Sequence, residues 1–335
     1  MHDHSRAADS LARRSVLTAL GAMAAGAALP ARAQARRWEP AKPIRLINGF
    51  SAGGSADILC RLLADALHPI LGQPVVVETR PGANGFIAAE AVSRSAPDGL
   101  TIGFATMSML TVSPQLPGVT LPIDTRADLT PIGSMAGIHT LLVASPDAPF
   151  KTIPELIAYG RANPGKLNYA SAGIGSFPHL AGELLGRKAG IEMVHVPYKG
   201  GAQAIVDVQA GRVHMLLGNM PDFLGQVKAG KLRGLAFAGD RVSPALPDLP
   251  LISRWLPDFN LSNWFGIVGP ARMPEPVVAT LSGAIRSVLE EPAIGKRLGE
   301  LGAVPLPSTP DRFVGRIDAD RRQWGDVIKA ANIRV

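Results

Sequence analysis

Short apolar runs rich in β-branched residues alternate along most of this chain with glycine-rich loops and amphipathic segments. Such runs occupy residues 44–47, 75–78, 101–104 and 193–196, and no Asn-Gly or Asp-Gly turn joins two neighbouring runs into a hairpin. Strands that alternate with helices form βαβ units, whose parallel strands lie in a sheet covered by helices. The pattern therefore predicts an α/β fold.

Length and composition narrow the class of protein further. The 335 residues are enough for two domains, and 47% hydrophobic against 18% charged residues allows a sizeable core. The 34 basic and 27 acidic residues are scattered, and three tyrosines and four tryptophans offer few aromatic contacts between them, which argues against a nucleic-acid partner. The single cysteine, Cys60, excludes an internal disulfide and any multi-cysteine zinc or iron–sulfur site.

Residues 1–35 have the layout of an export signal. Arg13 and Arg14 precede an apolar run at 16–29, which is shorter than the roughly 20 residues that cross a membrane, and small-residue cleavage sequences follow at 31–35. We expect cleavage there and export to the periplasm. The paired arginines also suit the twin-arginine route, so the sequence leaves the export pathway open. The other interpretation is an amphipathic or buried N-terminal helix.

Three predicted helices each begin directly after a strand run and a loop of small residues. The helices span 56–67, 178–188 and 203–210, and the loops before them span 53–55, 173–176 and 198–202. The first N–H groups of a helix have no partner within it, and the helix dipole attracts negative charge. In open α/β sheets such loops lie at the carboxyl ends of strands, where ligands bind. Each loop is therefore a candidate anion site, or else only a tight turn capped by Ser55 or Ser176.

Residues 49–53 match the G-x-S-x-G sequence of a hydrolase nucleophile elbow, with Ser51 as the nucleophile. The context disfavours this, since Ser51 lies close to the start of the mature chain and the last histidine is His214. An α/β-hydrolase-like esterase using Ser51 remains the alternative function. Residues 173–178 begin like a dinucleotide-binding fingerprint but carry Pro178 in place of the third glycine. With no phosphate-binding loop and only dispersed histidines, we expect no cofactor and no metal site.

Two polar side chains of the predicted helices have open roles. Asp57 can accept hydrogen bonds from the loop before its helix, can pair with Arg61 one turn later, or can do both. His179 can donate to a ligand carboxylate from the first turn of its helix. Alternatively, it can pair with Glu183 on an exposed face.

Three further residues receive structural interpretations. Cys60 borders the apolar face of its helix and is expected to fill the core, because a small thiol packs like a hydrophobe. Lys199 is expected to be solvated rather than catalytic. Trp264 can form the floor of a cleft, although core packing is the more common place for such a residue.

Sequence fragments along nearly the whole mature chain, about residues 42–325, resemble one family. They are P-I-R-L-I and F-S-A-G-G-S-A-D within 43–57, L-G-Q-P-V-V-V-E and R-P-G-A-N-G within 71–85, A-P-D-G at 96–99, A-N-P-G-K-L at 162–167, G-I-G-S-F-P-H at 173–179, V-P-Y-K-G at 196–200, K-A-G-K-L-R at 228–233, S-P-A-L-P at 243–247 and W-F-G at 264–266. In this order they are similar to the Bug-type periplasmic solute receptors, the substrate-binding components of tripartite tricarboxylate transporters.

The resemblance implies an α/β fold of the two-lobe periplasmic-binding-protein (venus-flytrap) type, with two mainly parallel sheets and helices on both faces. Lobe one would comprise residues 40–139 plus 238–335, and lobe two residues 140–237. The chain would cross between the lobes twice, and the ligand would lie in the cleft. Such a protein is a receptor and not an enzyme.

The family's ligands are small carboxylates, including di- and tricarboxylates, some amino acids and aromatic acids. Transferred by motif, the resemblance implies a set of ligand-binding residues: Phe50, Ser51, Ala52, Gly53, Gly54, Asp57, Thr106, Ser108, Ser171, Gly175, Ser176, His179, Tyr198, Lys199 and Asn219. Backbone N–H groups and water can carry an anion in such a site without an arginine. We therefore expect a di-/tricarboxylate or an aromatic acid as ligand.

Three positions depart from the family's pattern: Gly49 replaces a usual proline, Thr79 a usual asparagine, and Gly218 an aspartate that the family often carries. The missing carboxylate at Gly218 argues against an α-amino acid as ligand. The expected partners are the small carboxylate and, transiently, the membrane subunits of a transporter, with no nucleic acid, and the protein is predicted to be a monomer. An orphan receptor that passes a signal to a sensor protein is the remaining alternative.

Overall fold

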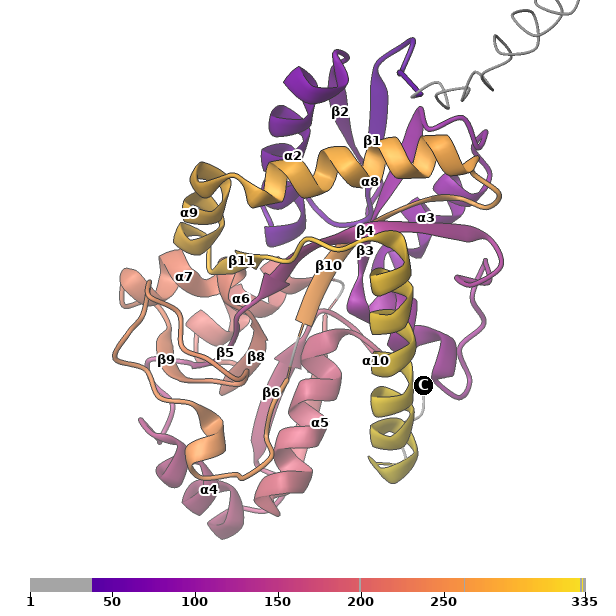
Figure 1. The fold of residues 1–335 in the computed structure, drawn as a ribbon. Coiled ribbons are helices and arrows are strands. Elements are labelled where there is room, and N and C mark those ends of the chain that lie inside the picture. The colour runs from indigo at the N-terminus through magenta and orange to yellow at the C-terminus, as the bar shows by residue number, and fades with distance from the viewer. Residues whose placement is uncertain (1–37, 199, 262, 332, 334–335) are drawn as a thin grey trace, which may run out of the picture. The chain divides into compact units, whose positions relative to one another are not determined.

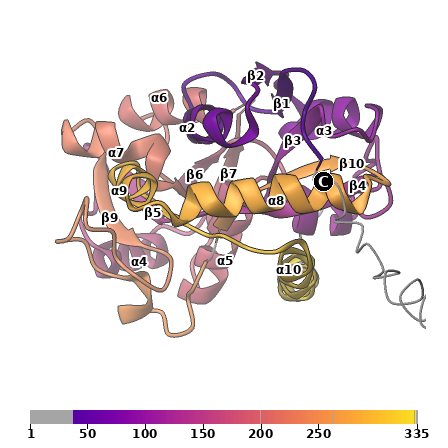
Figure 2. The same ribbon diagram turned by 45° about the horizontal axis from the view of Figure 1, so that its top comes forward.

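The computed structural model describes residues 38–198, 200–261, 263–331 and 333 (Figure 1). The predicted export signal and Lys199 lie outside these residues. The described chain contains two β-sheets with helices packed on both faces of each (Figures 1 and 2).

The first sheet contains the earliest and the latest strands of the chain, in the order β11-β4-β10-β3-β1-β2. Its strands are β1 (Ile44–Asn48), β2 (Val75–Thr79), β3 (Thr101–Thr106), β4 (Leu129–Ile138), β10 (Asn263–Pro270) and β11 (Ala303–Pro305). Strand β1 pairs parallel with β2 and β3, whereas β10 is antiparallel to β3 and β4, and β11 is antiparallel to β4. Four strands therefore share one direction.

The second sheet contains the middle of the chain, in the order β7-β6-β8-β5-β9. Its strands are β5 (Thr140–Ala144), β6 (Leu167–Ser171), β7 (Met193–Pro197), β8 (Met215–Asn219) and β9 (Arg233–Phe237). Strand β6 pairs parallel with β7 and β8, and β5 is antiparallel to β8 and β9. Four strands again run one way. The predicted α/β fold is thus confirmed, with mixed sheets in which β5, β10 and β11 oppose the common direction.

Nine helices and four short turns connect these strands in the described part of the chain. The helices are α2 (Ser55–Leu71), α3 (Phe86–Ser93), α4 (Ile153–Ala162), α5 (Phe177–Ala189), α6 (Gly201–Gln209), α7 (Met220–Lys228), α8 (Glu275–Glu290), α9 (Pro292–Glu300) and α10 (Pro310–Ala331); the turns are η1 (Ala83–Gly85), the π-type η2 (Ser108–Val112), η3 (Ser113–Gln115) and η4 (Ile252–Arg254). Helices α2 and α8 share a core with one face of the first sheet, while α3 and α10 cover the other. Helices α6 and α7 cover one face of the second sheet and α5 the other.

Helix α2 illustrates how the sequence determines an element. Leu59, Leu63 and Leu67 recur at helical spacing and are fully or almost fully buried. The helix ends at Gly72, whose left-handed conformation (φ 69°) lets its N–H donate to the carbonyl of His68 at 2.9 Å. The predicted helix at 56–67 is therefore confirmed and runs one turn further. Cys60 is completely buried, as predicted for a core residue.

The two sheets are connected through very little chain on one side. Only His139 separates β4 from β5, and its backbone N–H donates to Gly302 O at 3.2 Å while its carbonyl accepts from Met220 N at 2.8 Å. The return connection runs from β9 to β10. Trp264, near the start of β10, is 1% exposed and packs in the core, the commoner of its two expected places. The division into two lobes, residues 40–139 plus 238–335 and residues 140–237, stays a prediction.

Candidate functional site

Asn48, a buried residue at the end of β1, holds the start of the loop between β1 and α2. Asn48 Nδ2 donates to Phe50 O at 3.0 Å, and Asn48 Oδ1 accepts from Phe50 N at 3.1 Å. The Phe50 ring meets Phe104 edge-on, with centroids 6.1 Å apart. The backbone and the ring of Phe50 are thus both held in place, and the residues that follow, Ser51, Ala52 and Gly53, are exposed.

Asp57 holds the other end of this loop. Its Oδ2 accepts from Gly53 N at 3.1 Å and from Arg61 Nε at 3.1 Å, so both roles expected for Asp57 are present. Burial opposes ionisation of this carboxyl, but the hydrogen bonds from Arg61 and Gly53 outweigh it and lower the pKa of Asp57. The carboxylate is engaged within the loop and shapes it, which makes Asp57 a positioning residue.

The loop and the start of α2 present several backbone donors. Within the described chain, the N–H groups of Ser51 and Ala52 make no hydrogen bond, and the N–H of Gly54 closes a turn toward the Ser51 carbonyl without reaching normal hydrogen-bond geometry. Gly54 is the N-cap residue and contributes no side-chain acceptor. The next donor is already occupied, because Ser55 N donates to Asp222 Oδ1 of α7 at 2.9 Å. Sequence reasoning did not identify Asp222.

Thr106 and Ser108 lie beside this loop at the end of β3 and are both buried. Thr106 Oγ1 accepts from Met109 N at 3.2 Å and thereby fixes the turn η2. A methyl group on Gly85 would lie 2.6 Å from Met109 Sδ and 3.3 Å from the Phe50 ring. Phe50 and Met109 therefore meet across Gly85, at one end of the first sheet.

The loop between β6 and α5 is tied together by its own hydroxyl groups. Ser176 Oγ donates to Gly173 O at 2.6 Å, and Gly173 N donates to Ser171 Oγ at 3.1 Å. Gly175 N donates to His179 Nδ1 at 3.1 Å, so the proton of a neutral His179 lies on Nε2. Ser171 and Ser176 consequently shape this loop with their side chains.

His179 is buried, at 6% exposure, and the alternative of an exposed pair with Glu183 is wrong. Its ring stacks on His195 with centroids 4.0 Å apart, and His195 stacks in turn on Tyr169 at 5.0 Å. Glu183 instead accepts from the Tyr169 hydroxyl at 2.5 Å. The helical pattern suggested a polar face, but helix α5 turns this part of it toward the middle of β6 and β7.

Burial sets the charge of this histidine pair. It lowers the pKa of His179, and it lowers the pKa of His195 to about 4, with a smaller contribution from the positive charge of His179. Both rings are therefore neutral at neutral pH. A neutral His179 offers an N–H donor to a ligand and no full positive charge.

Tyr198 and Asn219 point to different partners. The Tyr198 hydroxyl donates to Asp207 Oδ2 at 2.7 Å, which directs it along α6 and away from the loop at Ser171. Asn219, at the end of β8, accepts from Asn263 Nδ2 at 2.6 Å and so links the second sheet to the start of β10.

The predicted site residues thus form three groups. The first is the β1–α2 loop with Thr106 and Ser108, the second is the β6–α5 loop with His179, and the third is Asn219. A methyl group on Gly175 would lie 2.6 Å from Leu116 Cδ1, so the second group borders the first sheet's turns, and the Ser55–Asp222 hydrogen bond joins the first group to α7. The Tyr198 hydroxyl is directed elsewhere, but its backbone N–H donates to Ser171 O at 3.0 Å, so Tyr198 borders the second group.

Sequence reasoning missed His195, Asp222 and Asn263. Two of them occupy positions that the sequence pattern could have indicated. Asp222 lies in the first turn of a helix after a strand, and Asn263 starts the strand that returns to the first sheet. His195 is half-buried on the edge strand β7, next to the equally half-buried Val196, so the exposure of this strand does not alternate strictly. None of these positions indicates its partner before the chain is folded.

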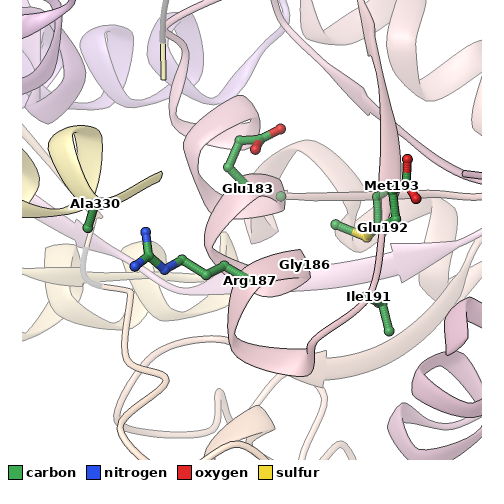
Figure 3. Close-up of a pocket in the computed structure, with 8 residues that line it drawn as sticks. Glu183, Gly186, Arg187, Ile191, Glu192, Met193 and Ala330 are labelled. Carbon is green, nitrogen blue, oxygen red and sulfur yellow. The ribbon is translucent and has the colours of Figure 1, made fainter. Parts of the chain in front are cut away.

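A surface cavity of about 400 Å³ lies elsewhere, along α5, β7 and the end of α10 (Figure 3). Its lining includes Glu183, Arg187 and Glu192, and Figure 3 shows Arg187 extending toward Ala330. It contains none of the predicted ligand-binding residues. Among the described residues, no group of three His, Cys, Asp or Glu side chains is placed to hold a metal, and no helix has both the length and the apolar character to cross a membrane.

Comparison with known proteins extends over nearly the whole chain. The family described as "Tripartite tricarboxylate transporter family receptor" matches residues 59–333. BugT of Bordetella pertussis is 32% identical over 325 residues, which are 96% of this chain and 98% of BugT.

Several solved structures are similar to most of this chain. A protein described as a periplasmic transporter superposes with a TM-score of 0.83 at 35% identity, covering 88% of this chain and 99% of its own. An R. palustris protein solved with adipate has a TM-score of 0.85 at 31% identity, with coverage of 88% and 99%. MatC from Rhodopseudomonas palustris with bound malate has a TM-score of 0.79 at 28% identity, with coverage of 86% and 99%.

Proposed function

The chain belongs to the receptor family of the tripartite tricarboxylate transporters, and from that premise we propose that it captures a small carboxylate in the periplasm and delivers it to the membrane subunits of such a transporter. The ligand would be a di-/tricarboxylate or an aromatic acid. The relatives solved with adipate and with malate support a carboxylate. Export would use the signal at residues 1–35.

The proposed site consists of the β1–α2 loop on one side and the β6–α5 loop on the other. Residues 40–139 plus 238–335 would form one lobe and residues 140–237 the other, closing on the ligand about the crossing at His139. Closure excludes water, and hydrogen bonds from N–H groups to a carboxylate are stronger in a medium of lower dielectric constant.

One observation carries the proposal: the backbone N–H groups of Ser51, Ala52 and Gly54 make no hydrogen bond of normal geometry in the described chain, at the start of a 17-residue helix. A carboxylate bound there would accept several charge-assisted hydrogen bonds, each stronger than a neutral one. The neutral His179 supplies a further donor from the other loop. This arrangement suits an anion, and the alternative of an esterase using Ser51 has less support, since in the described chain none of the histidines hydrogen-bonds to Ser51.

The test compares two substitutions at Gly54. Its φ of −82° suits proline, so Gly54→Pro removes one N–H donor from the site. Gly54→Ala keeps the N–H, and its added methyl group has room, since the nearest atom is 3.6 Å away. Calorimetric titration would use the mature protein, refolded to remove bound solute, with adipate, malate and benzoate as probes.

We expect the wild type to bind at least one of these probes and to gain about 2.7 kcal/mol of stability at 100 times the dissociation constant. Gly54→Pro should lose roughly tenfold or more in affinity, the value of one charge-assisted hydrogen bond, while Gly54→Ala should stay near wild type. Equal affinity of the proline and alanine variants, with unchanged melting temperatures, would refute the assignment of the donors.

A further inference from the structure

Helix α2 receives the acceptor for its first N–H from a distant part of the chain. Its N-cap residue, Gly54, has no side chain, although Asp, Asn or Ser commonly caps a helix at this position. Asp222 fills that role from α7, 167 residues away in sequence, with its Oδ1 2.9 Å from Ser55 N. A methyl group on Gly54 would lie 3.9 Å from the same oxygen, so this carboxylate directly adjoins the proposed site.

Neighbouring residues hold the Asp222 side chain in place. It lies in the first turn of α7, whose N-cap residue Asn219 is tied to Asn263. Burial raises the pKa of Asp222, while hydrogen bonds from Ser55 and Asn219 act to lower it. No salt bridge to Asp222 is found in the described chain, so hydrogen-bond donors and helix starts compensate its charge.

We propose that Asp222 determines which carboxylates this receptor accepts. Its side chain takes the donor at Ser55, directly beside the N–H groups proposed for the ligand carboxylate, so one negative charge of the protein already lies at the start of α2 and the ligand adds a second. The site therefore selects a ligand with a single carboxylate and a hydrogen-bond donor (hydroxyl, amide or ammonium) turned toward Asp222, and it discriminates against dicarboxylates. This inference rests on the proposed function and narrows its ligand class, since it keeps acids with one carboxylate, such as aromatic acids, and excludes the di- and tricarboxylates.

The energetics favour this selection. A dicarboxylate has two ways to bind, and both are costly. It can displace Asp222 from Ser55, which leaves a desolvated charge without its donor, or it can lie beside Asp222, where like charges repel in a medium of reduced dielectric constant. A hydroxyl or ammonium group instead donates to Asp222 and satisfies its free acceptor positions.

The test uses probes matched in chain length. Adipate carries a carboxylate at each end of six carbons, whereas 6-hydroxyhexanoate and 6-aminohexanoate carry one carboxylate and one donor. Calorimetry would measure all three with the wild type, Asp222→Asn and Asp222→Ser. Asp248→Asn, at an exposed position, makes the same charge change outside the site.

We expect the wild type to bind a probe with one carboxylate about tenfold or more tightly than adipate. Asp222→Asn should shift the ratio toward adipate by at least tenfold, because the amide removes the repulsion and can donate to the second carboxylate. Asp222→Ser should shift it the same way, which guards against a folding defect in one variant. Asp248→Asn should keep the wild-type ratio.

Two results would overturn the inference. A wild type that binds adipate as tightly as the other probes, with the same ratio in both Asp222 variants, would show that Asp222 is only a helix cap. That outcome leaves the proposed function intact. If neither the wild type nor the variants bind any of the carboxylates, the proposed function fails, and the role of Asp222 fails with it.

Discussion

Asp57 and His179 show what a sequence can tell about a single residue. The dual role of Asp57 was predictable because its partners, Gly53 and Arg61, each lie four residues away, within reach of a local hydrogen bond. The burial of His179 was not, because it depends on His195 of another strand. Residues whose partners are local could be assigned from the sequence, and residues whose partners are distant could not.

His195 gives a pH-dependent contribution to stability. Its pKa falls from 6.5 to about 4 on folding, so the folded protein binds fewer protons than the unfolded chain between these values. The contribution is therefore complete above pH 6.5 and is lost as the pH falls toward 4. For a partly exposed ring we expect about 1–2 kcal/mol between pH 7.5 and 5.

The measurement is the melting temperature of the wild type and of His195→Gln across that range. Glutamine keeps a polar group near Ser171 but does not titrate. The wild type should lose more stability on acidification than the variant does, whereas parallel curves would show that the ring is protonated equally well in both states.

At the scale of elements, the three helices and the four strand runs predicted from periodicity and glycine-rich loops are confirmed as α2, α5, α6, β1, β2, β3 and β7. The predicted strand run at 193–196 continues by one residue, to Pro197. The directions of the strands were less accessible. Strand β5 begins two residues after β4 ends but belongs to the other sheet, where it is antiparallel to both of its neighbours, β8 and β9. The pattern along a strand specifies its exposed face and leaves its neighbour undetermined.

Helix α5 contacts β6 through a glycine. A methyl group on Gly182 would overlap the ring of Tyr169, which is 1% exposed and held between His195 and Glu183. We expect Gly182→Ala to cost about 1–3 kcal/mol, because the buried ring has little freedom to move. Gly283→Ala in α8 is the control, since no atom lies within 4 Å of its added methyl group, and it should gain up to about 1 kcal/mol. Calorimetry would measure the melting temperatures of both variants. An unchanged melting temperature in Gly182→Ala would mean that the Tyr169 ring moves easily.

At the scale of the whole molecule, the sequence predicted which loops border the proposed site but not how they meet. The resemblance and the helix starts pointed to the β1–α2 and β6–α5 loops. The hydrogen bonds from Ser55 to Asp222 and from Asn263 to Asn219 join segments 167 and 44 residues apart. Such pairs depend on the path of the folded chain, and no local pattern encodes them.

The monomeric state is a prediction at this scale. In the described chain, the exposed large apolar side chains occur singly on different elements: Val76, Ile87, Ile174, Val194, Val206, Val242 and Val314. Single exposed apolar residues are ordinary for a monomer, whereas stable dimers bury contiguous apolar surface. Light scattering after size exclusion should give the mass of one chain with and without a carboxylate, and a doubled mass at micromolar concentration would contradict this.

The single residue between β4 and β5 has a mechanical consequence. In the proposed closure, the backbone angles of His139, whose N–H and carbonyl are anchored to Gly302 and Met220, would change together with those of the connection from β9 to β10. Its imidazole stacks edge-on against Phe237, at the end of β9, with centroids 5.9 Å apart. If the proposed closure changes this ring geometry, the ring current of Phe237 will shift the His139 proton resonances, so nuclear magnetic resonance with and without ligand would report the closure.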